Sequence, residues 1–271
     1  MPELPEVETT KRGIEPYLIG VCVDQVVIRQ AKLRWPISPE LPLSMAGQCI
    51  SSVSRRGKYL GIHTPKGTLI VHLGMSGSLY FVDQNTEPLF HDHVDIQLHS
   101  GRWLRNTDPR RFGAMLWTSA NWLEHSLLAQ LGPEPLSEAF NGDYLVSQAK
   151  GRKKPIKTFI MDSKIVVGVG NIYANEALFN AGIRPDRLAG RISAKRLATL
   201  VTCIQAVLAR AIEQGGTSLK DFVGGDGKPG YFKQSLLVYG RAGEACFGCA
   251  EPLLESRLGQ RSTVYCKRCQ T

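Results

Sequence analysis

Short runs of alternating apolar and polar residues fill the first half of the chain, separated by Gly, Pro, Asn and Asp. Runs of this length predict half-buried β-strands, and their close spacing is typical of a sandwich or barrel. A helix is expected before them, from Glu6 to about Leu18, with interruptions at Gly13 and Pro16. Residues 1–131 are therefore predicted to form a mostly β domain with strands at 21–28, 49–55, 59–63, 68–72, 78–82, 94–98 and 114–117.

The apolar pattern takes a helical period in the second half. Leu131–Leu136 carries two prolines and a glycine and is the best linker candidate. Apolar residues recur at helical spacing from Ser193 to Gln214, which predicts an amphipathic core helix. Another helix is expected after the turn Gly168–Gly170, with Asn171 as its N-cap and an end near Gly182. The N–H groups at such a helix start suit an anion such as a phosphate.

Several connections of the predicted β domain carry basic or bulky residues, as binding loops on a β scaffold often do. Examples are Arg55–Lys58, the 72–77 segment and the glycine-bounded 108–113 turn. Met75 and Phe112, on two of these loops, fit either core packing or wedges that enter a base stack. The glycine-rich segment 222–230 indicates a loop, which either closes over a ligand or is a connection without a function of its own.

The four C-terminal cysteines give the strongest chemical signal. Two Cys-x-x-Cys pairs separated by 16 residues provide the tetrahedral sulfur shell that a structural Zn²⁺ prefers: Cys246, Cys249, Cys266 and Cys269. A pair of disulfides is the alternative. Four thiolates leave no position open for water, so one zinc ion with a structural role is expected. Arg261 stands at the tip of the predicted hairpin between the pairs, where a fixed guanidinium suits phosphate recognition.

The remaining composition narrows the class of protein. Cys22, Cys49 and Cys203 are isolated from one another, which argues against disulfides. No apolar run reaches membrane-span length and the acidic start lacks the features of a signal peptide, so a cytoplasmic protein is expected.

The net charge of +9 is unevenly distributed along the chain: residues 1–149 carry 13 basic against 15 acidic side chains, and residues 150–271 carry 20 against 9. A basic half of this kind indicates nucleic-acid binding, although ribosomal-type or anionic-lipid binding fits it too.

The first six residues, Met-Pro-Glu-Leu-Pro-Glu, offer a candidate nucleophile. If Met1 is removed, Pro2 becomes a secondary amine beside Glu3 and Glu6, and such an amine can form an iminium with a carbonyl carbon. The other interpretation is an ordinary helix start, with Pro5 in the first turn and acidic residues at the positive end of the helix.

These motifs together resemble bacterial formamidopyrimidine-DNA glycosylases over nearly the whole chain. The resemblance rests on four stretches: 2–6, 108–113, 168–174 and the four-cysteine finger. It implies an α+β fold with an N-terminal helix and β-sandwich (1–131), a helix-two-turns-helix domain (132–240) and a zinc-ribbon hairpin (241–271). It also implies a monomeric enzyme that excises oxidised purines from double-stranded DNA and cleaves the strand at abasic sites.

The resemblance also implies roles for individual residues. Pro2 is the nucleophile, Glu3 the acid/base and Glu6 a supporting carboxylate, while Lys58 lies between the damaged nucleotide and its phosphate. The family's phosphate and backbone contacts correspond to His72, Lys157, Asn171, Tyr239 and Arg261. Met75, Arg110 and Phe112 match the trio that fills the space of the flipped nucleotide, and the segment around 224–230 resembles the base-capping loop.

Two other functions stay open. Endonuclease VIII, which acts on oxidised pyrimidines, is the nearest competitor, but it typically has Gly where Leu4 stands. A non-catalytic zinc-dependent DNA-binding protein would explain the basic half and the finger but gives Pro2 and Glu3 no role. Two positions depart from the family pattern: Lys267 replaces a common proline, which leaves the metal ligands intact, and Ser163 replaces a common glutamine. Neither departure argues against the glycosylase activity.

Overall fold

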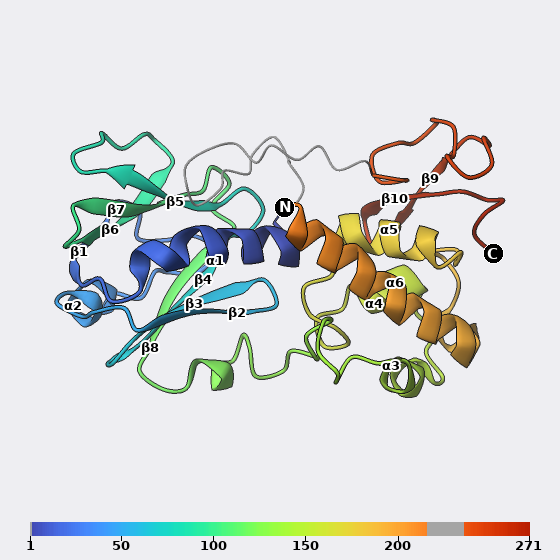
Figure 1. Ribbon diagram of the computed structural model, residues 1–271, viewed down its shortest axis with the longest axis horizontal. Coiled ribbons are helices and arrows are strands. Elements are labelled where there is room, and N and C mark those ends of the chain that lie inside the picture. Colours follow the sequence, from blue (N-terminus) through green and yellow to red (C-terminus); the bar gives the residue numbers. More distant parts are fainter. Residues whose placement is uncertain (1, 216–235) are drawn as a thin grey trace. The chain divides into compact units, whose positions relative to one another are not determined.

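The computed structural model describes residues 2–215 and 236–271 (Figure 1). The described residues divide into two compact units. Unit 1 runs to Gln130, and unit 2 consists of Leu131–Glu213 together with the C-terminal segment. The predicted base-capping loop at 222–230 lies outside the described residues.

Unit 1 is built on two antiparallel four-stranded sheets. One has the order β1-β6-β7-β5, with β1 Val23–Ile28, β6 Asp92–Leu98, β7 Arg102–Thr107 and β5 Ser78–Asp83. The other has the order β2-β3-β4-β8, with β2 Ser52–Arg56, β3 Tyr59–Thr64, β4 Gly67–His72 and β8 Ala114–Thr118. Buried residues of both sheets, such as Leu60, Leu69, Ile96 and Leu104, belong to one core. The predicted sandwich is confirmed, and every predicted strand begins and ends within three residues of an observed one.

Helix α1 (Leu4–Leu18) lies along the sandwich, against β5 of one sheet and against β2 and β3 of the other (Figure 1). Its buried residues Val7, Thr10, Ile14 and Leu18 repeat every three to four positions, as one helix face does. The helix passes through Pro16, so the expected interruption does not occur. The short elements α2 (Leu41–Met45) and η1 (Trp122–Glu124) complete unit 1.

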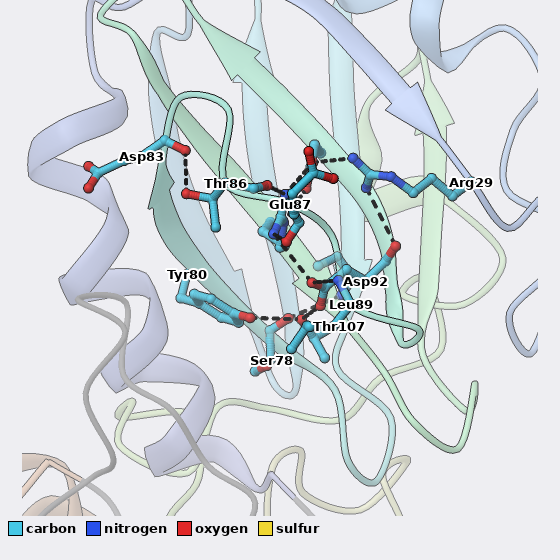
Figure 2. Close-up of polar contacts among 12 residues, drawn as sticks. Arg29, Ser78, Tyr80, Asp83, Thr86, Glu87, Leu89, Asp92 and Thr107 are labelled. Carbon is cyan, nitrogen blue, oxygen red and sulfur yellow. Dashed lines mark hydrogen bonds and ion pairs between the residues drawn. The ribbon is translucent and has the colours of Figure 1, made fainter.

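Strand β7 was not predicted from the sequence because its centre is polar. Arg105 in this strand is 1% exposed, and its five N–H groups have five acceptors. These acceptors are the carboxylates of Asp92 and Asp95 and the carbonyls of Thr86 and Glu87. Figure 2 shows Asp92 among these polar contacts, where it also accepts from the Leu89 N–H and the Thr107 hydroxyl. A buried ionic group is tolerated when its charge is paired and its donors are satisfied, so this strand lacks the apolar alternation of the others.

Cys22 and Cys49 form a disulfide that their spacing in the sequence did not predict. They face each other across an isolated antiparallel bridge, with Cα atoms 3.7 Å apart. The expectation that isolated cysteines carry no disulfide is therefore wrong here. The sandwich places the segments before β1 and β2 side by side although 27 residues separate the two cysteines in sequence.

Unit 2 is helical and ends in a hairpin. Its elements are α3 Gly142–Ala149, α4 Ile156–Ile160, α5 Asn171–Asn180, η2 Ala189–Arg191, α6 Ala194–Glu213, β9 Leu254–Leu258 and β10 Arg261–Tyr265. Helix α5 packs against α6 on one side and against β10 on another. The predicted core stripe of α6 is confirmed, since Leu197, Leu200, Ile204 and Leu208 are buried. None of the helices described is long and apolar enough to span a membrane.

Candidate functional site

The start of α1 fixes two carboxylates directly after Pro2. Glu3 is the N-cap residue, with extended backbone angles, and its side chain accepts a hydrogen bond from the backbone N–H of Glu6. The Glu6 carboxylate accepts in return from the Glu3 N–H at 2.8 Å, which completes a capping box. Pro2, Glu3 and Glu6 are all buried. The predicted nucleophile therefore directly precedes a capping box that fixes the carboxylates of Glu3 and Glu6.

Lys58 belongs to the tight turn between β2 and β3, where Gly57 adopts a φ of 58°. Arg55 links this turn to α1: it donates to the Gly57 carbonyl at 3.1 Å and to the Glu8 carboxylate at 2.8 Å. Burial opposes the ionisation of Glu8, but hydrogen bonds from Arg55 and then Arg12 outweigh it and lower the Glu8 pKa. The turn with Lys58 is thus tied to the second turn of the helix that begins beside Pro2.

His72 ends β4 as a neutral imidazole. Burial, followed by the charges of Lys58 and Arg34, lowers the pKa of His72 to about 4. Its Nδ1 lies 3.0 Å from the Gly74 nitrogen, whose N–H donates to it. The ring therefore carries its proton on Nε2, which can donate to an anionic oxygen.

We expect the His72 imidazole to titrate near pH 4 in the folded protein. An unfolded histidine binds a proton at about pH 6.5, so between these values the unfolded state binds more protons and folding stability falls as the pH drops. His72→Gln should remove this part of the pH dependence. His99→Gln, at a side chain that is 83% exposed, is the matched control. NMR titration of the imidazoles tests the assignment, and a His72 midpoint at or above 6.5 would contradict it.

The loops that carry the predicted wedge residues lie against each other. Met75 is on the β4–β5 loop, while Arg110 and Phe112 are on the β7–β8 turn. A Cβ added to Gly74 would come within 2.4 Å of the Phe112 carbonyl carbon, so the two backbones are in direct contact. The Arg110 guanidinium lies 5.0 Å from the centre of the Phe112 ring, and this ring is 43% exposed.

In unit 2, the predicted N-cap of α5 is wrong by one residue. Gly170 is the N-cap, with extended backbone angles, and Asn171 is the first residue of the helix. The Asn171 backbone carbonyl accepts from the Asn175 side chain at 2.5 Å. Its own side-chain oxygen is buried, with no hydrogen-bond partner among the described residues.

The C-terminal hairpin is fastened to the helices by buried polar side chains. Lys157 is buried, and its ammonium donates to the Ser262 carbonyl and the Thr263 hydroxyl, both at 2.7 Å. The Asn175 side-chain oxygen accepts from the Val264 N–H at 3.0 Å. Arg261, directly before this anchored stretch, is exposed. The phosphate contact expected of Lys157 remains a prediction, since in this structure its ammonium serves to hold β10.

Glu176 positions Tyr239, a role that was not predicted from the sequence. The Glu176 carboxylate accepts from the backbone N–H groups of Leu237 at 2.8 Å and of Val238 and Tyr239 at 2.9 Å. Glu176 is 4% exposed in the middle of α5. In the sequence, the only indication of this role is a charged residue within the predicted helix after Gly170. Three donors on one carboxylate fix the backbone at Tyr239.

Cys246, Cys249, Cys266 and Cys269 come together as predicted. Their sulfur atoms all lie within 4.8 Å of one another. The closer separations are 3.4 Å for Cys249–Cys266 and 3.9 Å for Cys246–Cys269, and all four cysteines are free of disulfides. Zn–S bonds of about 2.3 Å in a tetrahedron place sulfurs about 3.8 Å apart. The cluster therefore fits a metal ion, and the alternative of paired disulfides is wrong.

Known proteins match this chain over nearly its whole length. The family model "Formamidopyrimidine-DNA glycosylase N-terminal domain" matches residues 1–115, and "Formamidopyrimidine-DNA glycosylase H2TH domain" matches residues 131–223. Proteins named formamidopyrimidine-DNA glycosylase are 70% identical in Marinomonas sp. (strain MWYL1) and 60% identical in Pseudomonas paraeruginosa (strain PA7), each over the full length of both chains.

Solved structures give the same relationship. The MutM (Fpg) protein of Thermus thermophilus is 38% identical, with a TM-score of 0.89 over 99% of this chain and 98% of the other. Lactococcus lactis Fpg in complex with DNA containing N7-benzyl-Fapy-dG is 29% identical, with a TM-score of 0.92 over the full length of both chains. Two family models and relatives up to 70% identical over the full chain match, and this chain therefore belongs to the formamidopyrimidine-DNA glycosylase family.

Proposed function

We propose that this chain is a bifunctional base-excision-repair glycosylase. It removes oxidised purines, chiefly 8-oxoguanine and formamidopyrimidines, from double-stranded DNA and then cleaves the abasic strand. Relatives that carry the glycosylase name across their full length support this activity, as do solved Lactococcus lactis complexes with DNA containing Fapy-dG or an abasic site. The observation that carries the proposal is the start of α1, where Pro2 directly precedes the capping box of Glu3 and Glu6.

Pro2 acts as the nucleophile once Met1 has been removed. An α-amine has an ordinary pKa of about 8, so part of it is neutral near pH 7. The nitrogen attacks C1′ of the extruded nucleotide, the base leaves, and an iminium joins protein and sugar. Glu3 exchanges protons with the opening sugar, and Glu6 holds the Glu3 backbone. Loss of the 3′ and then the 5′ phosphate completes the cleavage.

The DNA contacts follow from the same family roles. In unit 1, Lys58 contacts the damaged nucleotide and its phosphate, and neutral His72 donates to a phosphate from Nε2. Met75, Arg110 and Phe112 enter the space that the flipped nucleotide leaves. Removing a base from the stack costs a few kcal/mol, and these insertions offset that cost. In unit 2, the DNA backbone contacts are Lys157, Asn171, Tyr239 and Arg261.

The four cysteines hold one Zn²⁺, and the metal has a structural role because four thiolates complete its coordination. This assignment is supported by the grouping of the four sulfur atoms. Residues 1–131 form the catalytic domain, residues 132–240 the DNA-binding domain and residues 241–271 the zinc-finger hairpin. The enzyme acts as a monomer.

Two alternatives are less well supported. An endonuclease VIII-type enzyme for oxidised pyrimidines is not favoured, because the relatives that are 60–70% identical over their full length are named formamidopyrimidine-DNA glycosylase. A non-catalytic zinc-dependent DNA-binding protein gives the buried carboxylates beside Pro2 no role.

Borohydride trapping tests the proposal. Incubation of protein lacking Met1 with an 8-oxoguanine duplex and borohydride is expected to yield a covalent protein–DNA adduct, because reduction makes the iminium permanent. An undamaged duplex of the same sequence is the control and should give none. Absence of an adduct from protein whose N-terminal Pro2 has been verified by intact mass would refute the mechanism.

A further inference from the structure

Two loops from different parts of unit 1 meet at one buried carboxylate. Asp108 follows β7 and is 0% exposed. Its Oδ1 accepts from the Ser76 hydroxyl at 2.9 Å, and its Oδ2 accepts from the Gly113 N–H at 2.8 Å. Ser76 belongs to the loop with Met75, and Gly113 closes the turn with Arg110 and Phe112. The carboxylate therefore bridges the two loops that carry the wedge residues.

The backbone around Asp108 is held by further hydrogen bonds. Its N–H donates to the His91 carbonyl at 3.0 Å, and its carbonyl accepts from the Arg111 N–H at 3.1 Å. The same carbonyl lies 2.9 Å from His93 Nε2. Arg111 adopts a φ of 55°, in the left-handed region that costs energy for a residue other than glycine. The turn is thus held in one uncommon conformation by contacts that all converge on Asp108.

Ser76 adds a second connection between the loops. While its hydroxyl donates to Asp108, its oxygen accepts from the Arg110 N–H at 3.2 Å. Ser76 is 9% exposed, so these bonds have little competition from water. The backbones leave no space between the loops, because a Cβ on Gly113 would meet the His72 carbonyl oxygen at 2.8 Å.

We propose that Asp108 and Ser76 are positioning residues that hold Met75, Arg110 and Phe112 as a single rigid wedge. They touch neither the DNA nor the reacting atoms. Their effect is to lower the conformational entropy that is lost when three side chains from two loops enter the duplex together. This inference rests on the proposed function, since it assumes that these loops open the base stack. It predicts that extrusion of the nucleotide depends on the pair while the chemistry at Pro2 does not.

The test compares a substrate that needs extrusion with one that does not. Single-turnover excision of 8-oxoguanine from a duplex requires the wedge, whereas cleavage of an abasic site in single-stranded DNA does not. Ser76→Ala and Asp108→Ala should slow the first about tenfold, the effect of losing a buried hydrogen bond and leaving its partner unpaired. The second reaction should remain within about twofold of wild type. A 2-aminopurine beside the lesion should show a slower fluorescence rise, because it reports unstacking directly.

Two matched variants sharpen the result. Ser54→Ala removes a serine hydroxyl that is hydrogen-bonded to His63 Nε2 at 2.6 Å on β2, away from both loops, and should leave both reactions unchanged. Asp108→Asn should restore much of the duplex rate, because its oxygen can accept from Gly113 while its NH₂ donates to Ser76. Melting temperatures verify that each variant is folded. If Asp108→Ala does not fold, the test is made with Ser76→Ala and Asp108→Asn.

Each outcome has one meaning. Selective loss on the duplex, with partial recovery in Asp108→Asn, supports the proposal. An equal loss on both substrates would show a general structural defect and overturn it, and so would unchanged duplex excision in both alanine variants. If the wild-type protein excises no 8-oxoguanine, the proposed function itself fails.

Discussion

A form of the protein that keeps one residue in front of Pro2 is expected to bind abasic-site DNA but to neither cleave nor be trapped on it. The extra residue converts the Pro2 nitrogen into an amide, which has no basic lone pair and cannot attack C1′. Removing a covalent nucleophile typically costs several orders of magnitude, so strand cleavage should fall on the order of 10³-fold or more. The measurement is cleavage of, and borohydride trapping on, the same abasic duplex by both forms of the protein.

The control for this experiment is DNA affinity, because the proposed phosphate contacts do not involve the Pro2 nitrogen. Both forms should bind a duplex with a non-cleavable tetrahydrofuran site within about threefold of each other, at one fixed salt concentration. Equal cleavage by the two forms would exclude Pro2 as the nucleophile. Loss of binding together with cleavage would instead mean that the extra residue blocks the site. Loss of cleavage with retained binding would make removal of Met1 a required step in producing the active enzyme.

The fold of unit 1 was predictable from local patterns to a large extent. Strands such as β3 and β4 alternate apolar and polar residues around tight turns, so period and turn chemistry identify them together. Strand β7 could not be found in this way, because Arg105 fills its buried centre and acquires its partners from Asp92 and Asp95 on the neighbouring strand. A residue's acceptability in a core depends on contacts that only the folded chain creates. The Cys22–Cys49 disulfide was missed for the same reason.

The residues of the candidate site also differ in whether the sequence alone could identify them. Residues that would touch DNA, such as Arg110 and Phe112, stand in short motifs that sequence reasoning can find. The positioning roles of other residues could not be found in this way, even where the residue itself, such as Asp108, stands in such a motif. The Asp108 carboxylate accepts from the Ser76 hydroxyl, and the Glu176 carboxylate accepts from the backbone N–H of Tyr239, so the partners of both are distant in sequence. Hydrogen bonds of this kind leave no periodicity and no spacing rule, so they had to be read from the structure.

Loss of the metal from the four-cysteine cluster is expected to unfold the hairpin and weaken DNA binding. Among the described residues, the buried cluster at the hairpin has five members, two of which are cysteines of the metal site: Val238, Cys246, Leu253, Val264 and Cys266. So small a core cannot hold the fold alone, and structural zinc in such domains supplies on the order of 10–16 kcal/mol of folding free energy. Without it, Arg261 is no longer fixed. Loss of one charge-assisted contact should weaken binding about tenfold to a hundredfold.

Paired cysteine variants separate this role from general thiol chemistry. Cys249→Ala removes a ligand and should abolish stoichiometric zinc, measured by elemental analysis of the purified protein. Cys203→Ala, at a free and partly buried thiol of α6 outside the cluster, should retain both zinc and DNA affinity. Because Pro2 and Glu3 belong to unit 1, borohydride trapping on single-stranded abasic DNA should persist in Cys249→Ala when the DNA concentration is raised to compensate for weaker binding. Full zinc content or wild-type duplex affinity in Cys249→Ala would contradict the structural metal site, whereas lost trapping at saturating DNA would mean that the finger is needed to assemble the catalytic unit.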